Sequence, residues 1–271
     1  MRFEPRLPRD DVNAPARSPV KDALVMLLGL AAIVGVFFGA TTLLIDRLVP
    51  YVPRSWESRM FPDFEELVHQ PETEDERAYE RHLEDLMARI SSHWPERPDG
   101  LHVGLLDEEL PNALAFPGGQ ILVTTGLMKE VESENELAFI LGHELGHYAG
   151  RDHLRSLGRG LTLALIMAAV GQSGAAGDLI GLSSQITGRA FSREQESRAD
   201  AFGLSLVVAE FGHVSGATDF FEKLPAPKSK IGRTLSTYLA THPVSDERVE
   251  AMERLAIEKD WPVEGRANPL E

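Results

Sequence analysis

The longest apolar run of the sequence lies near its N-terminus. Residues 23–45 carry no charged side chain and are rich in Leu, Val, Ala and Phe. A helix that crosses a bilayer needs this length and composition, so we expect one membrane anchor over residues 23–46. A cleaved signal peptide is the alternative, but the run is long and no small-x-small cleavage site follows it. Residues 1–22 contain four prolines among charges, which predicts a flexible tail.

Basic residues are unevenly distributed around this run. Five precede it within residues 1–22, whereas three follow it between residues 46 and 59. Cytoplasmic flanks of membrane helices carry an excess of Lys and Arg, so the difference favours a cytoplasmic N-terminus. We therefore expect residues 23–45 to lie in a lipid bilayer, with the bulk of the chain on its outer side.

The pattern then changes from helical to strand-like. Between residues 60 and 100, apolar positions recur at helical intervals among charges, which predicts a helical linker region. Short β-like runs follow at residues 101–106, 112–116 and 120–125. The last two are joined across Pro117-Gly118-Gly119, where the glycines can supply the positive φ of a hairpin turn. This hairpin either caps the helices or offers an edge strand to which an extended peptide adds.

Downstream, capping signals predict three helices. A capping box at Ser133 opens a helix that should end at Gly150. A second box at Ser192 opens a helix that runs to about Gly212. Acidic residues directly after Ser245 mark the start of the third, because negative charge is favoured at a helix N-terminus.

Two further patterns belong to this helical part. The stretch 160–177 has no charge and many Gly and Ala residues; it could dip into a bilayer, but its small residues fit a tightly packed buried helix and loop better. Glu194 and Arg198, four residues apart, predict an ordinary surface ion pair. Together the elements predict a mainly helical α+β domain with a small antiparallel sheet over residues 101–271.

Amino-acid composition limits the binding partners and the metal ligands that this chain can have. The chain has 42 acidic and 27 basic residues and a formal net charge of -15, which argues against a nucleic-acid partner because neutralising phosphates needs Lys and Arg in excess. It contains no cysteine, which excludes disulfides and thiolate metal sites. Any metal must therefore be held by His, Asp or Glu.

One motif carries a specific chemistry. His143-Glu144-Leu145-Gly146-His147 fits the pattern H-E-x-x-H inside the first predicted helix. A spacing of four residues places both imidazoles on one helical face, where they can bind a single ion. Zinc prefers such nitrogen ligands, and a catalytic site leaves one position to water. Glu144 is placed to take a proton from that water as a general base.

The third ligand has two candidates. His153 is the first, because residues 143–153 also fit the longer metzincin-like signature, in which a glycine bends the chain back to the metal. Glu196 is the second; with Asp200 it places two carboxylates on one helical face, which repel each other unless a cation lies near them. Asp200 could then orient a ligand imidazole, as carboxylates commonly do around zinc.

Four separated motifs occur in a recognisable order. They are Asn-Ala-Leu-Ala-Phe-Pro-Gly-Gly at 112–119, the H-E-x-x-H motif, Glu-Ser-Arg-Ala-Asp at 196–200, and His242-Pro243 followed by Arg248. In this combination the chain resembles the M48 family of zinc metallopeptidases, over roughly residues 101–255. The resemblance implies a zincin-like helical catalytic domain that hydrolyses peptide bonds in unfolded or extended polypeptides.

The resemblance also implies roles for individual residues. One zinc ion per chain would be bound by His143, His147 and Glu196, with Glu144 as the base. His242 would lie beside the zinc and stabilise the developing oxyanion, and Asp200 and Arg248 would support the site. The expected substrate-binding residues all lie in the hairpin: Asn112, Ala113, Ala115, Gly118 and Gly119.

Two alternatives remain open beside this reading. One is a zinc-stabilised, chaperone-like binding protein that does not cut, although a purely structural site has no use for Glu144. The other is a metzincin-like protease with His153 as third ligand. Many similar chains have several membrane spans, whereas this one has a single predicted anchor. We therefore expect a singly anchored protein of a bacterial inner membrane, with its catalytic domain facing the periplasm or the outside and a role in membrane or envelope protein quality control.

Overall fold

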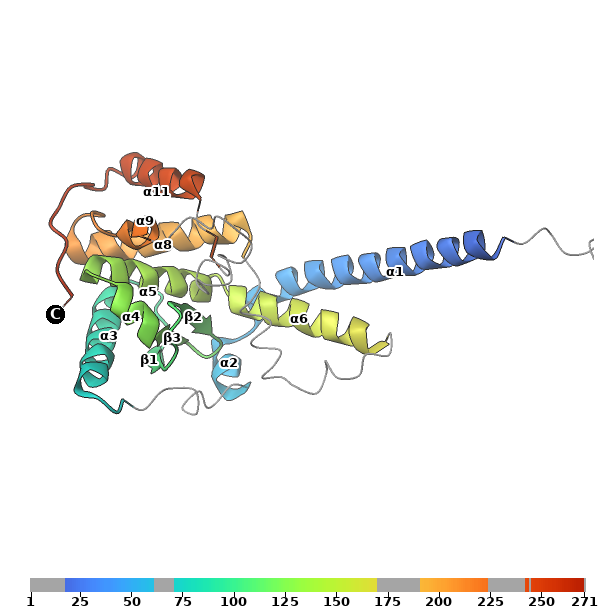
Figure 1. The fold of residues 1–271 in the computed structure, drawn as a ribbon, viewed down its shortest axis with the longest axis horizontal. Helices are drawn as coiled ribbons and strands as arrows, with labels where there is room; N and C mark the ends of the chain where they lie inside the picture. The colour runs from blue at the N-terminus through green and yellow to red at the C-terminus, as the bar shows by residue number, and fades with distance from the viewer. Residues whose placement is uncertain (1–17, 61–70, 170–190, 224–241, 244, 271) are drawn as a thin grey trace, which may run out of the picture.

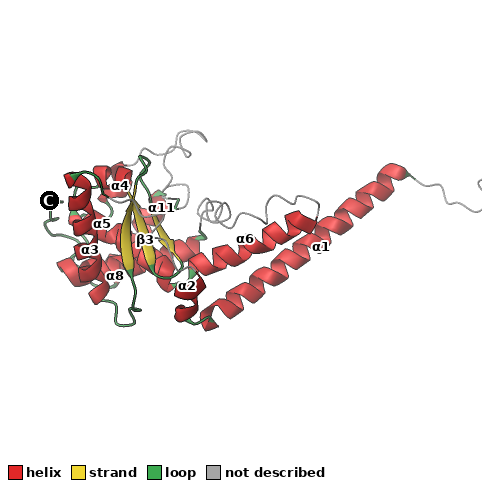
Figure 2. Ribbon diagram, turned by 90° about the horizontal axis from the view of Figure 1, so that it is seen from below, coloured by secondary structure: helices red, strands yellow, loops and turns green. Residues whose placement is uncertain are grey.

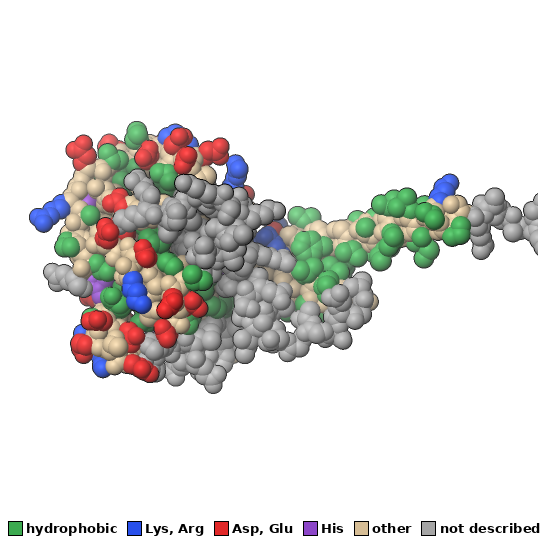
Figure 3. Space-filling view, in the orientation of Figure 1, with side chains coloured by type: hydrophobic (Ala, Val, Ile, Leu, Met, Phe, Trp, Pro, Cys, Tyr) green, Lys and Arg blue, Asp and Glu red, His purple; other side chains and the backbone are tan. Residues whose placement is uncertain are grey.

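The computed structural model describes residues 18–60, 71–169, 191–223, 242, 243 and 245–270. A long helix, α1 (Pro19–Leu48), projects from a globular body (Figure 1). Its apolar side chains are exposed, and Figure 3 shows them along much of its length. Among the described residues, the helix over Pro19–Tyr51 is the one long and apolar enough to cross a membrane. The predicted anchor, residues 23–46, lies within α1.

A short connection links α1 to the body. It consists of a 3-10 turn, η1 (Val49–Tyr51), and a helix, α2 (Arg54–Met60). Arg151 fastens this connection, because its guanidinium donates hydrogen bonds to the backbone carbonyls of Val49 and Val52.

The sheet has three strands: β1 (His102–Leu106), β2 (Ala113–Phe116) and β3 (Gln120–Thr124), in the order β1-β3-β2. The predicted hairpin is confirmed: β2 pairs antiparallel with β3, and Gly118 and Gly119 have φ of 88° and 87°. The sheet as a whole is mixed rather than antiparallel, because β1 pairs parallel with β3. The strands β1 and β2 run in opposite directions at the two edges, and β3 returns between them, so it must be parallel to one of its neighbours.

The remaining described helices surround this sheet. They are α3 (Glu74–Ser92), α4 (Thr125–Glu130), α5 (Glu134–Ala149), α6 (Asp152–Ala169), α8 (Arg193–Phe211), α9 (Asp219–Lys223) and α11 (Asp246–Glu258). The three helices predicted from capping signals correspond to α5, α8 and α11; both ends of α5 and α8 and the start of α11 lie within a residue or two of the prediction.

The helix α5 lies at the centre of the body, between the sheet and α8 (Figures 1 and 2). It is buried along nearly its whole length. The helix α3, which contacts both α5 and α8, contributes Leu83, Leu86, Met87 and Ile90 to the same hydrophobic core. A helix that is covered on all sides has no polar face, which explains the apolar composition of α5 before its two histidines.

The helices α5 and α8 approach each other unusually closely. A Cβ atom built on Gly203 of α8 would lie 2.9 Å from the backbone nitrogen of His143, and one built on Gly146 of α5 would lie 2.7 Å from the Cα of Ala199. Only hydrogen atoms fit in this space, so small residues on both helices permit the contact. The contact lies beside both histidines of the H-E-x-x-H motif, and it therefore sets the distance between α5 and the carboxylates of α8.

The prediction of a buried helix over residues 160–177 is confirmed only in part for its described residues. Residues 160–169 form the second half of α6, where Thr162 and Ala164 are buried but Leu161 is 40% and Leu165 63% exposed. The two leucines are exposed because α6 leaves the body on the same side as α1 and passes beyond the part that could cover it (Figure 2). Residues 170–177 lie outside the described residues.

Candidate metal centre

Local capping fixes the position of the first two histidines. Ser133 Oγ accepts a hydrogen bond from the backbone N–H of Glu136, which sets the start of α5. From this start, His143 and His147 fall one turn apart on the same face of α5, and both are buried. Glu144 is also buried and lies between them in sequence.

The helix α8 brings a carboxylate to the same place. A capping box fixes its start: Ser192 Oγ accepts from Gln195 N, and Gln195 Oε1 accepts from Ser192 N. Glu196 therefore lies in the first turn of α8, with its side chain buried against α5. His242 comes from the segment that precedes α11 and is buried as well.

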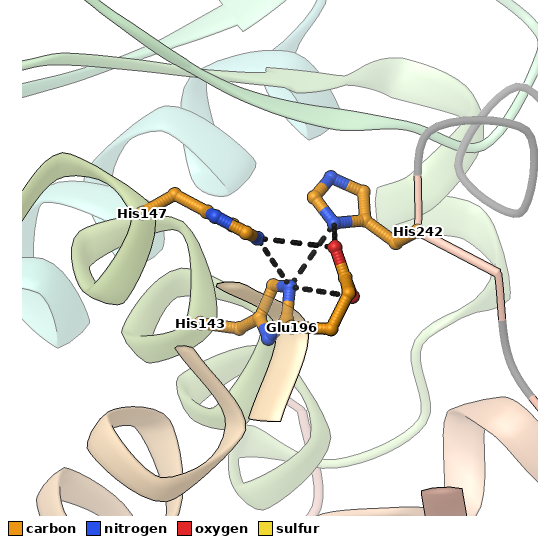
Figure 4. A group of neighbouring side chains, drawn as sticks. All are labelled: His143, His147, Glu196 and His242. Carbon is orange, nitrogen blue, oxygen red and sulfur yellow. Dashed lines mark hydrogen bonds and ion pairs between the residues drawn. The ribbon is translucent and has the colours of Figure 1, made fainter. Parts of the chain in front are cut away.

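These four side chains point toward one centre (Figure 4). Nε2 of His143 lies 3.0 Å from Nε2 of His147 and 3.1 Å from Nδ1 of His242. Oε1 of Glu196 lies 3.1 Å from the same His242 nitrogen and 3.4 Å from His147 Nε2. One ligand atom from each residue lies within 4.8 Å of every other, which is the arrangement that a single metal ion requires.

The chemistry of these donors fits a cation. Nδ1 of His143 lies 2.9 Å from Asp200 Oδ1, and Nδ1 of His147 lies 3.0 Å from Asp152 Oδ2. In a neutral imidazole, a carboxylate at this position holds the ring proton on Nδ1 and leaves Nε2 as a lone-pair donor. Two such nitrogens then face each other across 3.0 Å beside a Glu196 carboxylate. Lone pairs gathered so closely repel, and a cation between them removes the repulsion.

The pKa values of the histidines and of Glu196 show where this centre favours positive and negative charge. Burial opposes the charged form of His147, but its hydrogen bonds to Asp152 and Glu196 raise its pKa to about 9. Burial also opposes ionisation of Glu196, yet hydrogen bonds from His147 and His242 hold the pKa of this carboxyl far below its usual range. Burial lowers the pKa of His143 and of His242 to about 4. The centre thus favours one positive charge next to an ionised carboxylate.

The surroundings of Glu144 raise the pKa of its carboxyl group, whereas those of Glu196 lower it. Burial raises the pKa of its carboxyl to about 7, and the negative charge of Glu196 adds to the effect. Its Oε2 accepts a hydrogen bond of 3.1 Å from the backbone N–H of Ala115, and its Oε1 lies 3.3 Å from His242 Nε2. The carboxylate therefore lies between the edge strand β2 and the four clustered side chains.

Arg248 joins two carboxylates of α8, those of Glu196 and Asp200. Its Nε and one terminal nitrogen lie 2.7 and 2.6 Å from the two oxygens of Asp200, and its other terminal nitrogen lies 2.5 Å from Glu196 Oε2. Arginine offers a planar fork of donors that suits such a two-carboxylate contact. The predicted supporting pair, Asp200 and Arg248, is thus placed directly behind His143.

Sequence reasoning missed Asp152. This residue opens α6, is fully buried, and besides His147 it contacts Gln195 Nε2 at 2.7 Å. Arg198, which we expected to pair with Glu194 at the surface, instead donates to both oxygens of Asp152 at 2.8 and 2.7 Å. The signal that could have found Asp152 is its position five residues after His147, directly after the end of a predicted helix.

His153, the rival third ligand, points elsewhere. Its Nε2 lies 2.8 Å from Glu57 Oε2 in α2, and its ring stacks on Tyr148. It is not among the four clustered residues. The bend after Gly150 turns it toward α2 and the connection to α1, so it fastens the end of α5 rather than joining the cluster.

The predicted substrate-binding hairpin lies beside this centre. Because β3 occupies the middle of the sheet, β2 is an edge strand, and the N–H of Ala115 points outward to Glu144. Asn112 is buried at the start of this edge, where Thr124 Oγ1 accepts from its N–H at 2.9 Å. Gly118 and Gly119 form the turn at the other end.

The profile of Peptidase family M48 matches residues 73–256, which is more than half of the chain. The chain belongs to peptidase family M48. Similar M48 proteins include the mitochondrial metalloendopeptidase OMA1 of Arabidopsis thaliana, 33% identical over 146 residues that cover 53% of this chain and 29% of that protein. The metalloprotease LoiP of Escherichia coli (strain K12) is 34% identical over 149 residues, covering 51% of this chain and 56% of LoiP.

A third M48 relative is the β-barrel assembly-enhancing protease of Yersinia pestis, 28% identical over 162 residues that cover 55% of this chain and 33% of that protein. In each case the chain spans less than two thirds of the relative's own length. The M48 match includes α3, α5 and α8 and all four clustered side chains, because it extends to residue 256, beyond His242.

Proposed function

We propose that this protein is a membrane-anchored zinc endopeptidase that hydrolyses peptide bonds in unfolded or extended polypeptides. The observation that carries the proposal is the position of Glu144. Its carboxylate lies between a cluster of metal-ligand type and the outward N–H of an edge strand, 3.1 Å from Ala115 N. A structural metal site would have no use for a buried base in this position.

His143, His147 and Glu196 would hold one zinc ion per chain. When bound, zinc supplies a Lewis acid that polarises the scissile carbonyl and makes water a stronger nucleophile. Asp200 and Asp152 hold the two imidazoles by their Nδ1 protons, so that Nε2 of each ring is presented to the ion. Arg248 keeps Asp200 and Glu196 in place and offsets part of their charge.

Glu144 would act as the general base through Oε1. This oxygen accepts no hydrogen bond within the described part of the chain, although His242 Nε2 lies 3.3 Å from it. It is therefore available to take the proton of the attacking water and to return it to the nitrogen of the leaving amine. His242, on the same side, would donate a hydrogen bond to the oxyanion that develops on the scissile carbonyl.

Substrate would bind as an additional strand along β2. In the antiparallel register Ala113 faces Val123 and Ala115 faces Ile121, and residues two apart share the same edge of a strand. The N–H of Ala115 already uses this edge to bind Glu144. A substrate carbonyl that takes over this N–H would free both oxygens of Glu144 for catalysis and place the peptide next to the cluster.

The helix α1 would anchor the enzyme in a bacterial inner membrane, with the catalytic domain facing the periplasm or the outside. The distribution of basic residues around α1 supports this orientation. The named relatives include an enzyme called a β-barrel assembly-enhancing protease. We accordingly infer a role in quality control of membrane or envelope proteins.

The test compares Glu144→Gln with Glu194→Gln, a matched control on the exposed first turn of α8. Both full-length variants are purified in detergent, their zinc content is measured, and an unfolded casein is offered as substrate. We expect both to hold one zinc per chain, with cleavage by Glu144→Gln lowered by about 10²–10⁴-fold and cleavage by Glu194→Gln unchanged. Cleavage by Glu144→Gln at the parent rate would refute the mechanism, and zinc-dependent binding without cleavage by the parent would identify a chaperone-like protein instead.

A further inference from the structure

The first half of α6 runs beside the end of α1 that is nearest the body. A Cβ atom built on Gly158 of α6 would lie 3.0 Å from Cδ1 of Ile45 in α1. One turn of α6 holds two arginines against Asp46: Arg159 donates to both of its oxygens at 2.9 and 3.1 Å, and Arg155 Nε lies 3.4 Å from Oδ1. Both helices leave the body on the same side (Figures 1 and 2).

The contact surface continues along the apolar part of α1. Most side chains of α1 are exposed, but a partly covered stripe recurs every three or four residues at Val34, Phe38, Thr41, Thr42, Ile45 and Asp46. This spacing defines one face of a helix. It is the face that α6 contacts at Ile45 and Asp46, and it extends well into the uncharged run of the anchor.

Residues outside α6 indicate where the membrane surface would lie along α1 and the connection that follows it. Asp46 and Arg47 are the first charged residues after the run 23–45. Beyond them, Tyr51 and Trp56 are 73% and 55% exposed. Tyrosine and tryptophan are enriched at the interface between lipid and water, where an exposed aromatic ring has a favourable environment. Residues 46–56 therefore define the interface, and residues before 46 lie at the depth of the hydrocarbon.

Past Arg159, α6 runs antiparallel to α1 and away from this interface. Residues 160–169 contain no charged side chain, and ten residues of α helix advance about 15 Å, roughly half of a hydrocarbon core of about 30 Å. In this segment Leu161 and Leu165 are exposed. Exposed leucines on an uncharged helix are unfavourable in water and favourable in lipid.

We propose that residues 160–169 of α6 insert into the bilayer beside α1, to about half its depth, as a second attachment of the catalytic domain. The inference rests on the proposed anchoring by α1. Arg155 and Arg159 then lie at the level of the headgroups, where their charge also attracts anionic lipid. Because α6 begins at Asp152, which holds His147, the helix that enters the membrane is the one whose first residue positions the metal centre.

A second attachment would fix the rotational orientation of the catalytic domain relative to the membrane. A single anchor allows the domain to rotate about the axis of α1, whereas two adjacent helices in the bilayer prevent this rotation. The edge strand β2 and the metal centre would then keep one orientation relative to the membrane surface. Polypeptides that emerge from or lie along the bilayer are the substrates such an arrangement presents to β2.

Because the sequence contains no cysteine, a single introduced cysteine can be labelled specifically without first removing native ones. Nitroxide labels are placed in the full chain at Leu165→Cys, at Leu27→Cys on the exposed side of α1, and at Ile257→Cys, which is 73% exposed on α11. The protein is reconstituted into vesicles of phosphatidylcholine and phosphatidylglycerol. Collision rates of each label with oxygen, which concentrates in lipid, and with a water-soluble nickel chelate are measured by electron paramagnetic resonance.

We expect the oxygen-to-nickel ratio at position 165 to be severalfold higher than at position 257 and close to that at position 27. A ratio at 165 equal to that at 257 places the segment in water and overturns the inference, while a lipid signal at 27 leaves the anchor intact. A label at 165 shielded from both reagents indicates a protein partner and also overturns it. A water signal at position 27 removes the anchor and the inference together.

Discussion

Gly203→Ala tests whether the close contact of α5 and α8 sets the geometry of the metal centre. The added Cβ would lie 2.9 Å from His143 N and 3.2 Å from the carbonyl oxygen of Phe139. Both atoms belong to the backbone, so no side chain can rotate away. Ordinary van der Waals contacts of a Cβ atom begin at about 3.4 Å, so restoring such a contact requires α8 to move away from α5 by about half an ångström.

The movement has two measurable costs. Overpacking of this kind costs about 1–3 kcal/mol, and the better helix propensity of alanine returns up to about 1 kcal/mol. A net loss of about 1 kcal/mol therefore lowers Tm by a few degrees in a chain of this size. A displaced Glu196 would also lie too far from a zinc ion bound by the two histidines, because ligand distances tolerate only about 0.2 Å of error, and we expect zinc affinity to fall at least about tenfold.

The assay measures Tm by differential scanning fluorimetry and zinc affinity by competition with a chelator, both on the full chain in detergent. Gly39→Ala is the matched control, because this helical glycine of α1 has no atom within 4 Å of its built Cβ. The control should keep the parent's zinc affinity. If Gly203→Ala also keeps it, with an equal or higher Tm, then the helix contact does not determine the site.

Three further variants probe the residues around the centre. Asp152→Asn should weaken zinc binding about 10–100-fold in a chelator competition, because the amide lacks the negative charge beside His147 and its NH2 group would face the N–H donors of Gln195 and Arg198; unchanged affinity would make Asp152 purely structural. Arg248→Met should lower the metal-free Tm, since two carboxylates lose their counter-ion, and added zinc should raise this variant's Tm by more than the parent's; an equal or smaller gain would contradict the charge argument. Glu196→Ala should lose zinc while His153→Ala keeps it, measured by elemental analysis, and the reverse result would support the metzincin-like site.

Features with a local cause could be predicted from the sequence. The starts of α5 and α8 could be predicted from Ser133 and Ser192, because each hydroxyl accepts a hydrogen bond from a backbone N–H in the first turn of its helix. The turn of the hairpin follows from Gly118 and Gly119. The pairing of His143 with His147 follows from helical periodicity alone. Each of these depends on residues within a few positions of one another, so no knowledge of the tertiary fold is needed.

Features that depend on distant contacts could not be predicted. Asp152 reaches His147 only because the chain reverses after Gly150, with φ of 57° at Arg151. The partner of Arg198 was misassigned for the same reason, since the Asp152 carboxylate arrives from another helix. Burial of residues 160–169 could be predicted only in part, because an uncharged sequence does not show which side of a helix is covered; the packing of α6 against α1 decides this.

Anomalous X-ray diffraction at the zinc edge, on crystals of the zinc-loaded protein, tests the central claim most directly. The account predicts one strong peak per chain, within about 2.0–2.2 Å of Nε2 of His143, Nε2 of His147 and a carboxylate oxygen of Glu196. A peak near His153 and Glu57, or one at the two motif histidines with Glu196 too far away to coordinate it, would contradict the account.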